Sequence, residues 1–355
     1  MTDFIGESFT VPGNSSRFFT DKEIAINQHA GKIQLACNIQ DPYISNSDFD
    51  ASIIKYDEQY CTTVTNIDNS YLIPTLSYIN TVLSHFDASP FTIDIGCGQG
   101  ELVYALTHLG LDVAGFDPVL RKATSKLHKR MWSCSEQPAD LYVMRCVLPH
   151  IPNPWDFLSQ IWESSPNSFI LIEFQRIEWI IENKVWYQLS HDHVNIFSLD
   201  DFFTRYEVLK DGTFGFGEWG WVLLKNSKAK NSNLEFDVRL KTKLSELLID
   251  RIKSISQLKA LNKNLAIWGA AGKGIVLSSA LSDSGLSILA IDADKNRQGL
   301  YLENSGSYVI SPEEARDGLD KNTLILVSNP NHLEEIKNFL KDDERVHLPS
   351  DYLYT

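Results

Sequence analysis

The stretch FTIDIGCGQGELVYAL, residues 91–106, constrains the fold more than any other part of this chain. Residues 91–95 form a short apolar run that predicts a buried strand, and the leucines that follow at helical spacing predict an amphipathic helix. Between them, Gly96, Gly98 and Gly100 leave a surface without side chains. Such a backbone turns sharply and lets a ligand approach the amides at the helix start. The stretch therefore predicts a strand, a ligand-binding turn and a helix in succession.

Strand and helix patterns alternate on both sides of this turn. A helix is expected over residues 71–86, and strands are expected over 111–118, 139–147 and 167–174. This alternation predicts a parallel sheet with helices on both faces. Two apolar runs around a Gly-rich turn, in residues 206–225, predict a terminal antiparallel hairpin instead. We take residues 66–225 as one module.

The order of strand, glycine turn and helix returns in LAIWGAAGKGIVLSSAL, residues 265–281. A polar stretch and a predicted long helix precede it, so residues 226–262 are assigned as linker and long helix. Residues 263–355 form the second module, and residues 1–65 are expected to be a small irregular segment. The predicted fold class is α/β, with two doubly wound Rossmann-like modules in series behind that segment.

Charge and cysteine content restrict the function. The chain has 355 residues, with 32 basic and 46 acidic side chains and a net charge of -14, so no nucleic-acid partner is expected. The sequence shows no signal segment and no apolar run of membrane-spanning length, which predicts a cytoplasmic protein without a membrane partner. No two cysteines lie close in sequence, which supports neither a disulfide framework nor a zinc ribbon. The five are Cys37, Cys61, Cys97, Cys134 and Cys146.

Two acids accompany the first glycine turn. Asp117 ends the strand after the turn, where a carboxylate can accept both hydroxyls of a ribose, and this spacing alone also admits NAD. Asp94 precedes the first glycine. The order acid-x-Gly-x-Gly-x-Gly resembles motif I of the class I S-adenosylmethionine-dependent methyltransferases. The resemblance implies S-adenosyl-L-methionine as cofactor, with the turn around its amino-acid end and the second acid on its ribose. The implied cofactor-binding residues are Asp94, Gly96, Gly98, Gly100 and Asp117.

VMRCVLPHIPNPWDFL (143–158) resembles the stretch after the fourth strand of the same class I methyltransferases, with His150 retained and Pro149 in place of the usual Glu. Two further stretches resemble the sugar C-methyltransferases. They are ENKVWYQLSHDHVNIFSLDDFF (182–203) and the second module from WGAAGKG to VSNPNHLEEI. Asp192 and His193 fall on that family's Glu-His positions, whereas Ser190 replaces its usual Tyr. The resemblance implies a substrate that is a nucleotide-linked deoxy-keto-sugar, methylated on carbon.

That family's N-terminal module usually folds around zinc held by four cysteines. Here only Cys37 lies near a plausible ligand position. Because a tetrahedral zinc site needs four ligands, no structural zinc is expected.

Carbon methylation requires that a proton next to a ketone leaves first, which calls for a general base. His193 is the first candidate, and His150 is the second. Asp192 could orient or tune His193, although neighbours on a strand point to opposite faces. His191 would share a face with His193, so both could be surface or core-rim residues, or two ligands of a metal. The predicted catalytic residues are thus His193, His150 and Asp192.

The second glycine turn, residues 269–274, matches neither a Walker loop nor a dinucleotide-binding fingerprint. Asp292 ends the next strand, as a ribose-binding acid would, so an NAD-dependent oxidoreductase is a rival interpretation. A purely structural module is another. The family resemblance favours a surface that holds a nucleotide-sugar, with Lys273 and Gly272 near a phosphate. For the whole chain, an O-methyltransferase acting on a carbohydrate and a cofactor-binding module without turnover are the alternatives.

Overall fold

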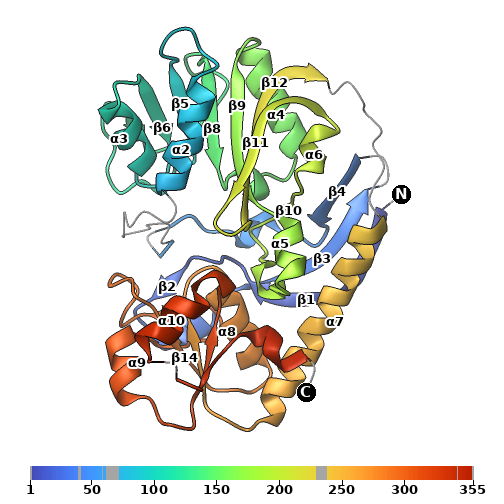
Figure 1. Ribbon diagram of the computed structural model, residues 1–355, viewed down its shortest axis with the longest axis vertical. Coiled ribbons are helices and arrows are strands. Elements are labelled where there is room, and N and C mark those ends of the chain that lie inside the picture. Colours follow the sequence, from blue (N-terminus) through green and yellow to red (C-terminus); the bar gives the residue numbers. More distant parts are fainter. Residues whose placement is uncertain are drawn as a thin grey trace.

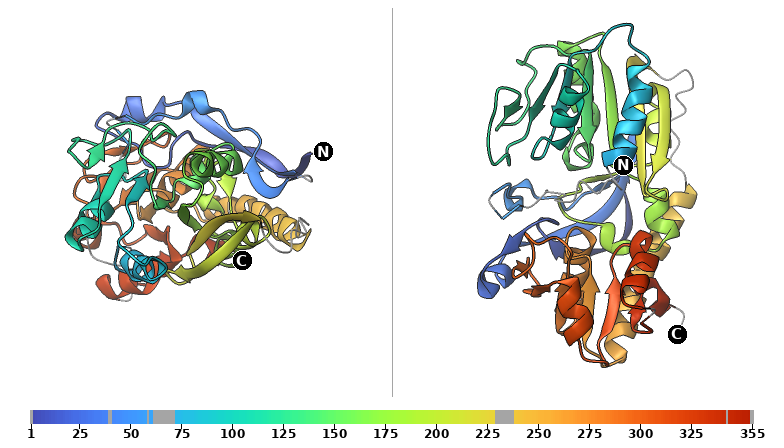
Figure 2. Two further views of the ribbon diagram at one scale, coloured as in Figure 1. Left: turned by 90° about the horizontal axis from the view of Figure 1, so that it is seen from above. Right: turned by 60° about the vertical axis from the view of Figure 1, so that its left-hand side comes forward.

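The computed structural model describes residues 2–38, 41–57, 59–60, 72–228, 238–341 and 343–353. Two α/β modules lie one above the other, and the strands of the N-terminal segment lie between them (Figures 1 and 2). The long helix α7 (Val238–Ala260) runs along one side of the second module. The structure thus has the predicted α/β fold class, and strands of the N-terminal segment pair with strands of both modules.

The first module contains a seven-stranded sheet in the order β11-β12-β9-β8-β5-β6-β7. Its first five strands in the chain pair in parallel, and the last two form an antiparallel hairpin of which β12 also pairs with β9. This confirms the predicted alternation and the predicted hairpin. The strands are β5 (Thr92–Ile95), β6 (Val113–Phe116), β7 (Leu127–His128), β8 (Leu141–Arg145), β9 (Phe169–Gln175), β11 (Tyr206–Phe214) and β12 (Trp219–Lys228). The helices are α2 (Leu72–Leu83), α3 (Glu101–His108), α4 (Pro154–Ser164), α5 (Ile177–Glu182) and α6 (Asp200–Phe203).

The second module contains a five-stranded sheet in the order β16-β14-β13-β17-β18, with every pair parallel. Near-continuous apolar runs such as Leu265–Trp268 and Leu324–Val327 suit strands that are covered on both faces. The strands are β13 (Leu265–Trp268), β14 (Ile288–Ile291), β16 (Val309–Ile310), β17 (Leu324–Val327) and β18 (Val346–His347). The helices are α8 (Lys273–Asp283), α9 (Pro312–Gly318) and α10 (Leu333–Phe339).

The N-terminal segment is more regular than expected. It forms the antiparallel strands β1 (Thr2–Pro12), β3 (Ala30–Asn38) and β4 (Asp41–Asn46), and β10 (Asn195–Ile196) of the first module completes this sheet. The short helix α1 (Lys22–Ile26) follows β2 (Phe18–Phe19), which pairs with β15 (Tyr301–Leu302) of the second module. The alternation of β1 is weak because a register shift between Ile5 and Phe9 interrupts it. Strand periodicity is therefore hard to detect in this part of the sequence.

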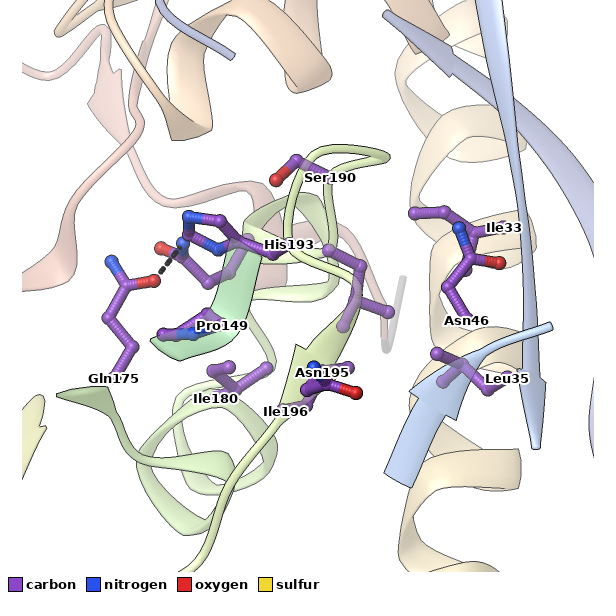
Figure 3. Close-up of a pocket in the computed structure, with 12 residues that line it drawn as sticks. Ile33, Leu35, Asn46, Pro149, Gln175, Ile180, Ser190, His193, Asn195 and Ile196 are labelled. Atoms are coloured by element: carbon purple, nitrogen blue, oxygen red, sulfur yellow. Dashed lines mark hydrogen bonds between the residues drawn. The ribbon is translucent and has the colours of Figure 1, made fainter. Parts of the chain in front are cut away.

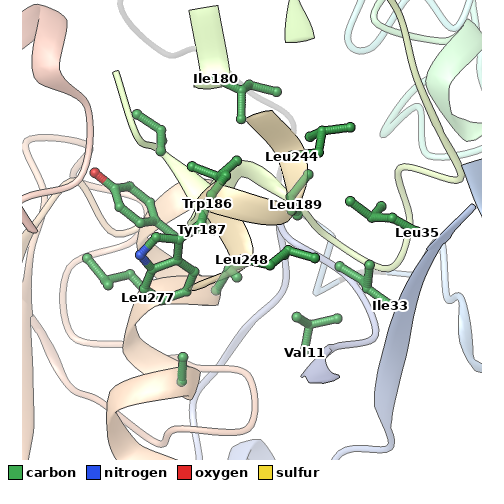
Figure 4. Packing of buried hydrophobic residues seen from close by; sticks show 14 of the residues in the cluster. Val11, Ile33, Leu35, Ile180, Trp186, Tyr187, Leu189, Leu244, Leu248 and Leu277 are labelled. Carbon is green, nitrogen blue, oxygen red and sulfur yellow. The ribbon is translucent and has the colours of Figure 1, made fainter. Parts of the chain in front are cut away.

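One hydrophobic cluster joins all three parts of the molecule (Figure 4). Burial of these apolar side chains, rather than a single contact, fixes the modules relative to each other. Its members come from the N-terminal sheet, the segment after β9, α7 and α8, and include Val11, Ile33, Leu35, Ile180, Trp186, Tyr187, Leu189, Leu244, Leu248 and Leu277. In the described part of the chain, no helix combines the length and the apolar character needed to cross a membrane.

Candidate active site

The first glycine turn adopts a backbone that few other residues could follow. Gly96, Gly98 and Gly100 have φ angles of 71°, 59° and 94°, in the region that favours glycine. A Cβ on Gly96 would also lie 2.3 Å from Cγ2 of Val147. The carboxylate of Asp117 accepts a hydrogen bond of 2.9 Å from the Gly98 amide. The turn is thus tied to the acid predicted to bind a ribose.

Asp94 is the least satisfied polar group in this turn. It is fully buried, and neither carboxylate oxygen has a hydrogen-bond partner among the described residues. Burial raises its pKa to about 7, against the opposing charge of Arg145 and with the support of Asp117. A buried carboxylate in this state favours a cationic donor. The ammonium group at the amino-acid end of S-adenosylmethionine meets that need, so these residues fit the implied cofactor.

The two histidines predicted to act in catalysis lie together. Their rings are 4.6 Å apart at 73°, an edge-to-face arrangement. His150 ends the short 3-10 helix Leu148–His150, which directly follows the Val147 side chain at the glycine turn. Its Nδ1 lies 2.7 Å from the carbonyl oxygen of Asp192. Because a carbonyl only accepts, Nδ1 carries the proton and Nε2 of neutral His150 is left as an acceptor.

His193 is uncharged at neutral pH. Burial and, to a smaller extent, the charge of His150 lower its pKa to about 4, against the opposing negative charge of Asp192. Burial by itself would raise the pKa of Asp192, but attraction to His193 and His150 in their protonated forms holds it below its usual value. The pair is therefore a neutral imidazole beside a carboxylate, which is the protonation state that a general base requires.

His191, in contrast, belongs to the packing of the N-terminal segment. The Asp50 amide donates to its Nε2 at 3.1 Å, which leaves Nδ1 as the donor to the Lys32 carbonyl at 2.8 Å. Its ring stacks on Phe49 at 5.2 Å. His191 therefore shares no ligand position with His193. Within the described residues, no group of three or more His, Cys, Asp or Glu side chains is placed to hold a metal ion.

A small cavity lies beside His193 (Figure 3). It measures about 20 Å³, which is room for about one water and far too little for a sugar ring. Hence this cavity by itself is not a substrate pocket. Its lining combines apolar side chains with amides and comprises Ile33, Leu35, Asn46, Pro149, Gln175, Ile180, Gln188, Leu189, Ser190, His193, Asn195 and Ile196.

The second glycine turn is closed by the protein's own groups. The Gly272 amide donates to the carbonyl of Ser15 at 2.8 Å. The carboxylate of Asp292 accepts from the Ala270 amide at 2.8 Å and from Arg297 at 3.2 Å. Asp292 thus has a cationic partner in addition to the turn amide, and the structure offers no support for the NAD interpretation of this module.

Lys273 lies at the boundary between the modules. It is 8% exposed, and its ammonium pairs at 2.5 Å with Glu218, which immediately precedes β12. It also lies over the ring of Trp179, 5.3 Å from the centroid. The same Glu218 carboxylate accepts from Asn329 and Asn331 at 3.1 and 2.9 Å. A phosphate at Lys273 would therefore compete with Glu218.

Ser15 and Glu218 have roles in the structure that no sequence pattern indicates. Ser15 stands in GNSSR, which is typical of a loop, and Glu218 follows the Gly-rich turn of the hairpin. Both acquire their partners only through contacts between distant parts of the chain. The best available signal for Glu218 is the Asn-Pro-Asn run at 329–331, which supplies two of its donors.

Comparison with known proteins supports the assignment of the first module. Residues 76–205 match the family model described as a methyltransferase domain. The chain therefore contains a methyltransferase domain, which lies within the first module.

Solved structures resemble about half of the chain. The PH0226 protein from Pyrococcus horikoshii OT3 is 12% identical, with a TM-score of 0.35 over 45% of this chain and 93% of that one. A plantazolicin methyltransferase is 18% identical, with a TM-score of 0.35 over 46% and 87%. Magnesium protoporphyrin IX methyltransferase from Synechocystis PCC 6803 is 13% identical, with a TM-score of 0.35 over 48% and 90%. No curated protein matches the chain.

Proposed function

We propose that the enzyme methylates a carbon atom of a nucleotide-linked deoxy-keto-sugar through an enolate. The observation that carries this proposal is the neutral His193 beside Asp192 and His150, because His150 closely follows Val147, whose side chain lies against the glycine turn. The Asp192–His193 pair also occupies the positions that resemble the sugar C-methyltransferases. We propose cytoplasmic action on a small molecule.

In this proposal, proton removal, cofactor binding and contact with the sugar fall to different residues. A ring nitrogen of neutral His193 removes the proton next to the ketone, and the carboxylate of Asp192 stabilises the imidazolium that forms. Asp94, Asp117 and the glycine turn hold S-adenosylmethionine, which supplies an electrophilic methyl group when bound. His150 presents Nε2 as an acceptor, which suits a hydroxyl of the sugar.

The proposed binding site for the nucleotide part of the substrate lies at Lys273 and Gly272. Lys273 is a buried cation between the modules, and its charge contributes to lowering the pKa of His193. A diphosphate could replace Glu218 as its partner, because Glu218 would keep the two amide donors of Asn329 and Asn331. The Gly272 amide already donates to Ser15, so its part is to give the turn its shape.

O-methylation is the second candidate, and one observation favours it. The acceptor Nε2 of His150 and the neutral ring of His193 could equally remove a proton from a sugar hydroxyl. The two reactions differ in whether a carbon-bound proton leaves before methyl transfer.

Proton exchange in heavy water separates these candidates. An enolate-forming enzyme should exchange the proton next to the ketone of a nucleotide keto-sugar even without the methyl donor. His193→Ala should lower exchange and methyl transfer together by about 10²- to 10⁴-fold, with cofactor affinity unchanged, because it removes a general base. His332→Ala, at an exposed histidine paired with Glu335, is the control and should match the wild type.

Product analysis completes the test. Normal exchange with lost methylation in His193→Ala would place His193 outside the proton transfer. A methyl ether, formed without any exchange, would establish O-methylation in place of C-methylation.

A further inference from the structure

Ser15 joins three parts of the molecule through its own main chain and side chain. Its amide and its hydroxyl both donate to Oδ2 of Asp192, at 3.3 and 3.2 Å. Its carbonyl accepts from the Gly272 amide at 2.8 Å. Ser15 is 8% exposed, so these bonds form away from competing water. The N-terminal segment thus reaches the catalytic loop and the second glycine turn through one residue.

We propose that Ser15 is a positioning residue of the active site, which acts through the carboxylate of Asp192. The inference rests on the proposed function and extends it to the N-terminal segment. Two donors on one oxygen fix the direction of that carboxylate and stabilise its charged form. Asp192 in turn holds His150 through its carbonyl and faces His193 with its charge. One serine thereby sets the geometry of both histidines.

The chain around Ser15 is built to hold it. Arg17, 4% exposed, donates to both oxygens of Asp57 at 3.2 and 2.7 Å and lies 3.6 Å from Glu303 of the second module. Arg17 also forms an isolated β-bridge with Tyr60. Arg17 thus ties the chain two residues after Ser15 to both the N-terminal segment and the second module, and Ser15 itself is bonded on both its amide and its carbonyl side. The Ser15 donors are therefore presented in a fixed direction.

Other groups share the surroundings of Asp192 and bear on any titration of it. The carboxylate of Asp192 contributes to raised pKa values of two tyrosines and a glutamate, and two histidines act on Asp192 itself. These groups are Tyr56, Tyr60, Glu303, His150 and His193. Since Ser15 is uncharged, its replacement changes no charge in this set.

The test compares Ser15→Ala with Ser15→Thr and with Ser8→Ala. Ser8 also donates its hydroxyl to an aspartate, Asp48 at 2.7 Å, but on the exposed face of the same segment. Carbon-13 NMR of the aspartate carboxylates should show a higher pKa for Asp192 in Ser15→Ala, because a donor to the charged form is lost. Methyl transfer should fall about tenfold, because the carboxylate is no longer held in one direction. Ser15→Thr should restore both, and Ser8→Ala should change neither.

An unchanged titration of Asp192 in folded Ser15→Ala would overturn the proposal. If that variant does not fold, Ser15→Gly is titrated in its place. It also lacks the hydroxyl and keeps the amide donor, so the pKa of Asp192 should rise in the same way. The titration needs no substrate. A wild-type enzyme that methylates no nucleotide keto-sugar would therefore refute the proposed function and leave the Ser15 result standing.

Discussion

The two glycine turns of this chain have similar local sequences, but they differ in whether their polar groups already have partners within the protein. Each follows a parallel strand, precedes a helix and faces an acid at the end of the next strand. At the first turn, the end-of-strand acid Asp117 accepts from the Gly98 amide, but Asp94, the acid that precedes the turn, is buried with no hydrogen-bond partner among the described residues. At the second, Asp292 is bound by an amide and by Arg297, and the Gly272 amide is bound by Ser15. The comparison indicates that this supersecondary unit can serve as a ligand site only where the rest of the chain leaves a polar group without a partner.

The largest effect is expected at Gly98. Gly98→Val places a side chain where the cofactor approaches and strains a φ of 59°, so S-adenosylmethionine affinity should fall by more than about 100-fold. Gly110→Val is the matched control in the same module, since Gly110 also has a positive φ, of 86°, but a Cβ there would meet no atom within 4 Å. Isothermal titration calorimetry of S-adenosylmethionine binding to both folded variants measures this difference in affinity. Equal affinities would remove the first turn as the cofactor site.

The two acids should respond in different ways to the same substitution. Asp94→Asn removes the charge for the cofactor's ammonium and should weaken binding about 10- to 100-fold with little loss of stability. Asp292→Asn should leave binding unchanged and lower the free energy of unfolding by about 2 kcal/mol, because it breaks a largely buried ion pair. Calorimetric titration and urea unfolding measure the two quantities. Similar binding losses in both variants would break the comparison.

A smaller effect is expected from pH. Asp94 has a pKa raised to about 7, so it is mostly protonated below neutral pH and cannot then pair with a cation. Binding of S-adenosylmethionine should therefore tighten about tenfold from about pH 5.5 to about pH 7.5, as the carboxyl ionises. Asp94→Asn should flatten this dependence. A profile with the same slope in that variant would assign the titration to another group.

Local features of the first module could be predicted from the sequence. The glycines at 96, 98 and 100 and the acid at 94 act within one short stretch, so their spacing alone conveys the turn. The hairpin of β11 and β12 is also accessible to prediction, because its Gly-rich turn separates two apolar runs. In both cases the local sequence is sufficient to predict the conformation, because no contact with a distant part of the chain is needed to define it.

Features that depend on distant partners could not be predicted. The strand β1 has few buried residues and a register shift, so its identity comes from pairing with β3. His191 and His193 look equivalent in sequence, yet the ring of His191 is hydrogen-bonded to the main chain of Lys32 and Asp50 and therefore has a packing role. Lys273 is expected at a phosphate, but nothing in the sequence shows that Glu218 lies opposite.

The pairing of β2 with β15 has a consequence for how the protein forms during synthesis. Phe18 and Phe19 find their partner strand at Tyr301–Leu302, near the other end of this sequence. At ribosomal rates of about 5–20 residues per second, the early segment waits roughly 15 to 55 seconds for it. The sheet of the first module has all its strands before then. We therefore expect nascent chains to acquire cofactor binding first and to complete the surroundings of Asp192 only as the last third emerges.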